Sequence, residues 1–144
     1  MFSRVFILAL LLIVACDRDL SDDPIPIVPF ADFTINIYFP EYQVLNNDGG
    51  FKQFGNLGVR GVIVYRNSAS NYSAYEVNCS YHPNEAGSNI TIHPSNLYMQ
   101  CGGCGSTFGF TDGMPTGGIA WRPLRKYRTE FNSPNLTIIN EIAN

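Results

Sequence analysis

Two short pairs of metal-ligand residues constrain the fold of this 144-residue chain more than any other feature. The first pair is Cys79-x-x-His82, and the second, 18 residues further on, is Cys101-x-x-Cys104. Thiolate and imidazole are common ligands of zinc and iron, and small β domains surround such metals with two donors from each of two loops. The spacing therefore predicts two loops, distant in sequence, that meet at one point.

The segments around these pairs alternate in polarity as β-strands do. Residues 33–39 read as a half-buried strand, whereas residues 59–65 are apolar on both faces, as a central strand would be. Residues 72–77 are expected to form a hairpin with that central strand. Further strands are expected at residues 90–92, 97–99, 108–110, 125–131 and 136–139. Turn signals recur about every eight to twelve residues, which predicts an all-β sandwich or barrel.

The first fifteen residues have the pattern of a signal peptide. Arg4 supplies a positive charge, and residues 5–15 form an apolar run that is too short to span a bilayer. The run ends in Ile13-Val14-Ala15-Cys16, which resembles a lipobox. We therefore expect Cys16 to be acylated and to become the mature N-terminus; the alternative is an ordinary cleavage site that happens to precede a cysteine.

Residues 16–30 then read as a tether between the lipidated cysteine and a β domain at residues 31–144. The segment is rich in Asp and in alternating Pro, a composition that favours an extended chain. Lipid chains on Cys16 would hold the protein at a membrane surface outside the cytoplasm. The acidic residues after Cys16 resemble a signal that sorts lipoproteins to the cell surface in some Gram-negative bacteria. This resemblance implies the outer membrane or the cell surface rather than the inner membrane, and the leaflet stays open.

Composition excludes one further class of function. The formal net charge is −3, and no basic cluster stands out, so we expect no nucleic-acid partner.

Residues 79–127 resemble the two boxes of the Rieske iron–sulfur family. The family's first box, Cys-x-His, is similar to Cys-Ser-Tyr-His at 79–82, and its second box is similar to Cys-Gly-Gly-Cys-Gly-Ser-Thr-Phe at 101–108. Gly113, Gly117-Gly118 and the Pro-Leu-Arg-Lys-Tyr run at 123–127 follow in the family's order. The resemblance covers roughly residues 55–140. It implies a Rieske-like antiparallel β-sandwich with two metal-binding loops at one tip.

The resemblance also implies a 2Fe–2S cluster and assigns its ligands. Cys79 and Cys101 stand at the family's two cysteine positions. Cys104 stands where the second histidine is expected, and Tyr81 occupies the place of the first, with His82 one residue later. The expected metal ligands are thus Cys79, His82, Cys101 and Cys104.

Two more residues are implied beside the cluster. By resemblance, Ser106 would donate a hydrogen bond to a cluster sulfur, and Phe108 stands where high-potential members carry a tyrosine. The chain has no room for a separate catalytic or flavin domain. The first hypothesis is therefore a lipid-anchored electron carrier that serves a redox partner protein and is not itself an enzyme.

Two alternatives remain open for the same residues. Zinc accepts a Cys₃His set tetrahedrally, and in an oxidising compartment two of the three cysteines could instead form a disulfide. The leader has a lone Arg4 and no Arg-Arg pair, so it lacks the signal for export of a folded, cluster-loaded protein. The rival hypothesis is a Rieske-fold binding or structural lipoprotein with zinc or a disulfide in place of the cluster.

Overall fold

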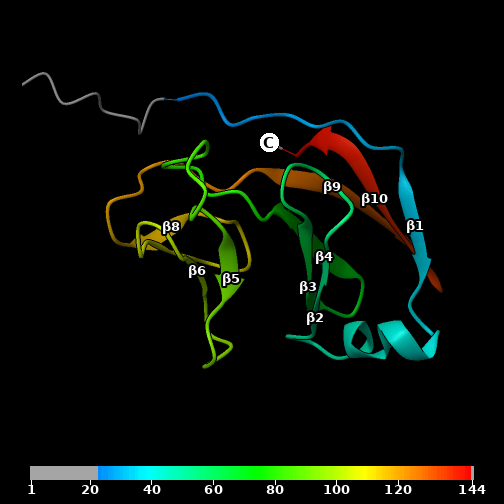
Figure 1. Cartoon of the computed structure of the whole chain (residues 1–144). Helices are drawn as coiled ribbons and strands as arrows, with labels where there is room; N and C mark the ends of the chain where they lie inside the picture. Colours follow the sequence, from blue (N-terminus) through cyan, green and yellow to red (C-terminus); the bar gives the residue numbers. More distant parts are fainter. Residues whose placement is uncertain (1–22, 144) are drawn as a thin grey trace, which may run out of the picture.

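The computed structural model describes residues 23–143 and is almost entirely β (Figure 1). The predicted signal peptide, residues 1–15, and the predicted lipidation site, Cys16, lie outside the described residues. Within residues 23–143 no helix is long and apolar enough to cross a membrane. The strands form two sheets, and every pairing between strands is antiparallel. The all-β prediction is confirmed.

The larger sheet has six strands in the order β1-β10-β9-β4-β3-β2. Their bounds are β1 (Phe33–Asn36), β2 (Phe51–Phe54), β3 (Val62–Ser68), β4 (Asn71–Glu76), β9 (Lys126–Asn132) and β10 (Asn135–Ile142). A short 3₁₀ helix, η2 (Pro40–Asn46), connects β1 to β2. The two ends of the domain pair with each other, because Phe33 of β1 lies opposite Ile138 of β10.

A hydrophobic core lies against one face of the six-stranded sheet. All six strands and η2 contribute to it, so the sheet wraps around these side chains. In β10, Leu136 and Ile138 point into this core while Thr137 between them does not, as the two-residue period of a strand requires. Its buried members are Ile35, Ile37, Leu45, Phe54, Leu57, Val62, Val64, Tyr72, Ala74, Tyr127, Leu136 and Ile138.

The smaller sheet has four short strands in the order β5-β6-β7-β8. Their bounds are β5 (Ile90–Ile92), β6 (Met99–Cys101), β7 (Thr107–Phe108) and β8 (Pro115–Gly117). A second core joins this sheet to β3 and β4, whose Ile63 and Tyr75 enter it. Strands β3 and β4 therefore pack against a core on each face. The apolar pattern of residues 59–65 predicted this for β3.

Strand boundaries differ from the sequence-based expectations in several places. The strand expected at 33–39 ends at Asn36, where a turn and η2 begin. The strand expected at 97–99 is shifted to Met99–Cys101 because it pairs with β5 in the register Ile90 to Cys101. The sequence pattern predicts neither β2 nor β8. Strand β8 has only three residues, Pro, Thr and Gly, which carry no alternating pattern.

Candidate metal centre

Two loops of the described chain carry the four predicted ligands. The first, residues 77–89, follows β4, and its ends are closed by the Cys79 amide, which donates to the Ser88 carbonyl at 2.9 Å. The second, residues 102–106, joins β6 to β7; it carries Cys104 and begins directly after Cys101, the last residue of β6. It is closed by the Cys101 amide, which donates to the Ser106 carbonyl at 2.9 Å. The Gly102 amide donates to the Asn89 carbonyl at 2.9 Å, so the two loops are hydrogen-bonded to each other.

The three cysteines converge between these loops. The sulfurs of Cys79, Cys101 and Cys104 all lie within 4.8 Å of one another, and Cys79 Sγ is 3.8 Å from Cys104 Sγ. Cys79 and Cys101 are fully buried, whereas Cys104 is partly exposed. All three are free thiols. The predicted meeting of the two loops at one point is confirmed.

Backbone amides surround two of these sulfurs in the same way. The amides of Tyr81 and His82 act to lower the pKa of Cys79, and those of Gly103 and Cys104 act to lower the pKa of Cys101. In each loop the donors come two and three residues after the cysteine. Amide donors stabilise a thiolate, which is the form of cysteine that binds a metal.

The hydrogen bond between Cys79 and Cys101 shifts the pKa values of these two buried thiols in opposite directions. A hydrogen bond from Cys79, together with amide donors from its own loop, lowers the pKa of Cys101 to about 5, although burial opposes this. The same bond with Cys101, together with burial, raises the pKa of Cys79. Of the two, Cys101 is therefore the one whose proton is lost more readily. A bound cation would favour loss of the remaining protons.

Ser106 lies directly beside Cys104. Its Oγ is 3.2 Å from Cys104 Sγ and accepts from the amides of Ile119 at 3.1 Å and Ala120 at 2.9 Å. A hydroxyl has two acceptor positions and one proton. In the free thiol, Cys104 Sγ donates to Ser106 Oγ. Once Cys104 loses its proton to a bound metal, the Ser106 hydroxyl becomes the donor to its sulfur, because both acceptor positions of Oγ are used by the amides.

A close backbone contact holds this arrangement. Gly118 has φ +88°, and a Cβ there would lie 2.6 Å from both Cα and Oγ of Ser106. Only glycine lets residues 118–120 approach close enough to donate to Ser106. The glycine at 118 thus has a structural reason here.

His82 lies on the first loop but outside the three-sulfur group. Its ring packs edge-on against Tyr81 at 4.2 Å between centroids, and its Nδ1 is 3.6 Å from Glu85 Oε1. That Nδ1 is buried and has no hydrogen-bond partner among the described residues. An unpaired buried nitrogen is unfavourable, so His82 offers an unpaired nitrogen on the loop that carries Cys79.

Tyr81 and Phe108 have packing roles. Tyr81 is half-buried against the second core, which also contains the buried ring of Phe108 together with Cys79 and Cys101. Apolar side chains therefore pack against Cys79 and Cys101 alongside the polar backbone groups of the two loops.

Arg122 is a residue that the sequence did not single out. Its guanidinium donates to the carbonyl of Ser80, next to Cys79, and to the carbonyl of Asp23 at 2.9 Å. The Ser80 hydroxyl in turn donates to the Arg122 carbonyl at 2.7 Å. No local pattern marks such a contact, because its partners lie 42 and 99 residues away.

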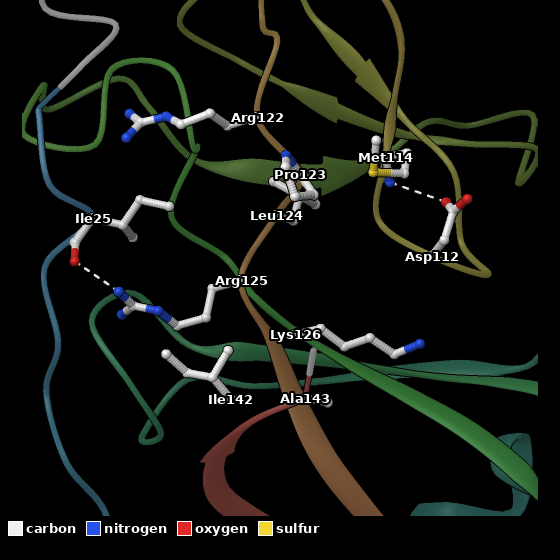
Figure 2. Close-up of a pocket in the computed structure, with 10 residues that line it drawn as sticks. All are labelled: Ile25, Asp112, Met114, Arg122, Pro123, Leu124, Arg125, Lys126, Ile142 and Ala143. Carbon is white, nitrogen blue, oxygen red and sulfur yellow. Dashed lines mark hydrogen bonds between the residues drawn. The ribbon is translucent and has the colours of Figure 1, made fainter.

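A cavity of about 650 Å³ lies beyond Arg122 (Figure 2). Arginine and lysine side chains and several apolar side chains line it, and none of the three cysteines does. In Figure 2 Ile25 and Arg125, which line it from opposite ends of the chain, are joined by a hydrogen bond. The cavity is thus a separate feature from the cysteine site.

Comparison with known proteins gives structural matches only. No protein-family profile and no curated protein matches the chain. A solved complex of reduced oxygenase and oxidized ferredoxin in carbazole 1,9a-dioxygenase aligns over 68% of this chain and 87% of that chain, with 18% identity and a TM-score of 0.50. The ferredoxin of carbazole 1,9a-dioxygenase from Nocardioides aromaticivorans aligns over 66% and 88%, with 17% identity and a TM-score of 0.46. The first of these matches supports the predicted Rieske-like fold.

Proposed function

We propose that this chain is a lipid-anchored Rieske-type iron–sulfur protein that carries electrons outside the cytoplasm. The observation that carries the proposal is the convergence of three cysteine sulfurs within 4.8 Å, on two adjacent loops of a Rieske-like fold. Anchoring through Cys16 is proposed from the lipobox alone. The oxygenase–ferredoxin complex among the structural neighbours is consistent with a redox partner protein for this chain as well.

The residues present fit a soft or borderline metal. Cys79, Cys101 and Cys104 supply three sulfurs, two of them already surrounded by amide donors, and His82 supplies an unpaired buried nitrogen. When bound, a 2Fe–2S cluster supplies a one-electron redox centre. Around it this chain would exclude water with the second core and present the Ser106 proton to Cys104.

The exposed side of the site lies at the second loop. Cys104 is partly exposed, and the neighbouring Gly102 and Gly103 are exposed and carry no side chains. Only backbone atoms of these glycines would therefore separate a partner protein from the Cys104 sulfur, and this short distance favours electron transfer.

Metal analysis of the protein purified without oxygen from its own host tests the proposal. We expect red-brown protein with about two iron and two sulfide per chain and a paramagnetic signal on reduction. His82→Ala should change that signal. His93→Ala is the matched control, because the His93 ring bonds to Ser95 and stacks on Tyr98 in the β5–β6 hairpin, away from the cysteine loops. Colourless protein without iron would contradict the electron-carrier function.

A single zinc ion is the second candidate, and one distance favours it. Four ligands at about 2.3 Å in a tetrahedron stand roughly 3.8 Å apart. Cys79 Sγ and Cys104 Sγ are 3.8 Å apart, which matches this spacing. In that case the purified protein would be colourless with one zinc per chain, and the metal would serve to hold the two loops together.

A further inference from the structure

The first described residues are bound to the β domain along their length. Residues 23–30, here called the N-terminal strap, run beside the domain before entering β1 (Figure 1). The Arg125 guanidinium donates to the carbonyls of Ile25 and Pro26, and the ring of Phe30 packs edge-on against Tyr127 at 5.2 Å. The strap therefore has a fixed place on the domain.

The N-terminal end of the strap lies at the cysteine loops. Asp23 accepts from Arg122, which also holds the carbonyl of Ser80 beside Cys79. The Asp23 carboxylate accepts from Asn84 at 3.0 Å, and Asn84 belongs to the loop that carries Cys79 and His82. The chain thus reaches the domain at the tip that carries the metal site.

The distance from this point to the predicted anchor is short. Seven residue steps separate Cys16 from Asp23. A fully extended chain covers at most about 3.6 Å per step, so Asp23 can lie no more than ~25 Å from the lipidated residue. A domain on this strap cannot turn its metal-site tip far from the membrane.

Exposed apolar side chains are present at the same tip. Trp121 is 59% exposed and Ile119 is 58% exposed, on the loop whose amides donate to Ser106. The guanidinium of Arg122 lies over the Trp121 ring at 5.4 Å while it bonds to Asp23. Trp121 therefore lies beside the point where the strap begins. Tryptophan is enriched where a protein meets the interfacial layer of a bilayer.

We propose that Trp121 and Ile119 contact the lipid interface of the membrane that carries the anchor, so that the metal-site tip faces that membrane. The inference rests on the proposed lipidation of Cys16. Its consequence for function is that the electron partner is itself bound to the same membrane, since a partner free in solution would meet the opposite end of the domain.

The test uses Trp121 as its own reporter, because it is the only tryptophan in the chain. The full-length lipidated protein is reconstituted in phosphatidylcholine vesicles with bromine on the upper acyl carbons. We expect Trp121 to lose most of its fluorescence relative to vesicles without bromine. Ile119→Glu should restore the fluorescence, whereas Leu97→Glu should not, since Leu97 is 77% exposed in the hairpin at the other end of β5 and β6.

Two insertions of the same flexible Gly-Ser segment test the role of the strap. Placed between Asp22 and Asp23, the insertion lengthens the anchor and should reduce the quenching. Placed between Phe30 and Ala31, it leaves the strap bound and the anchor short, so quenching should persist. Equal effects of the two insertions would overturn the proposal.

Other outcomes separate this inference from the proposed function. Unquenched Trp121 in iron-loaded, vesicle-bound protein would overturn the inference and leave the electron carrier standing. Quenched Trp121 in protein without iron would support the inference and contradict the electron carrier. Protein that is not lipidated on Cys16, and does not bind the vesicles, would overturn the inference through its premise.

Discussion

At the scale of single residues, each cysteine sulfur of the site is contacted by its own set of polar groups. Backbone amides two and three residues after Cys79 and Cys101 act to lower the pKa of each thiol, whereas Cys104 is hydrogen-bonded to the side chain of Ser106. Ser106 also satisfies the amides of Ile119 and Ala120. One hydroxyl therefore links the second cysteine loop to the loop at 118–120.

Replacing this hydroxyl should weaken both the fold and the metal site. Ser106→Ala leaves two amides without an acceptor, so we expect the free energy of unfolding to fall by about 1–3 kcal/mol. Metal affinity should fall by about 10–100-fold, because the Cys104 sulfur loses its donor. Zinc competition with a coloured chelator measures the affinity. Ser70→Ala, in the exposed β3–β4 hairpin, is the control, and equal affinities for the two variants would contradict the role of Ser106.

At the scale of elements, short loops rather than long strands build the site. The strands that flank it, β5 to β8, have only two or three residues each. Their loops are held by cross-loop hydrogen bonds and by the close approach of Gly118 to Ser106. Backbone conformation at a few positions therefore decides whether the three sulfurs meet.

Gly118→Ala tests this dependence. A methyl group would lie 2.6 Å from Cα of Ser106, at a φ of +88° that alanine rarely adopts. We expect a loss of at least about 1–3 kcal/mol in unfolding free energy, measured by urea denaturation. Gly55→Ala is the matched control, because a Cβ at Gly55 meets nothing within 4 Å. Its effect should stay within about 0.5 kcal/mol, and a similar loss in both variants would show that residue 118 is not special.

At the scale of the whole molecule, β3 and β4 hold the two sheets together because both cores pack on them. Two buried tyrosines of the larger sheet also donate hydrogen bonds from their hydroxyl groups. The Tyr75 hydroxyl donates to the Phe110 carbonyl beyond β7 at 2.8 Å, and the Tyr127 hydroxyl donates to the buried carboxylate of Glu76 at 2.8 Å. Each of these hydrogen bonds requires a protonated phenol.

These tyrosine hydrogen bonds predict loss of stability at alkaline pH. Burial raises the pKa of Tyr75 to about 12, above its ordinary value of 10.0, and burial and Glu76 raise that of Tyr127 as well. A raised pKa means that the contribution of Tyr75 is complete below pH 10 and is lost as pH rises towards 12. Unfolding free energy measured from pH 8 to 12 should fall in this window. The fall should be smaller in Tyr75→Phe, and an identical fall in both proteins would contradict the assignment.

The predicted anchor also acts on the whole molecule. Cys16→Ala removes the residue that would carry the lipid, so we expect the protein to move from the membrane fraction to the soluble fraction. Cell fractionation with an antibody to the β domain measures this. Cys104→Ala, which leaves the leader unchanged, is the control and should stay with the membrane. A Cys16→Ala protein that remains membrane-bound would show that something other than Cys16 holds it there.

Patterns among neighbouring residues determined the fold class of this chain and part of its cysteine site. Period-two alternation and turn residues are properties of neighbouring residues, and they predicted the all-β class and the β3–β4 hairpin. The two-residue spacing within each ligand pair predicted the meeting of Cys79, Cys101 and Cys104. The alternation is a local property, and a tight loop brings Cys101 and Cys104 to one side. The meeting of the two loops themselves depends on the hydrogen bond between Gly102 and Asn89, which the rest of the fold positions.

Other features were decided only by tertiary structure. Pairing of β1 with β10 joins residues about a hundred positions apart, and the strap is held by Arg122 and Arg125, whose partners are 99 and 100 residues away. The position of His82 outside the three-sulfur group depends on how its ring packs against Tyr81. Such contacts carry no local signature, because packing and burial select them from many sequence-compatible pairings once the core has formed.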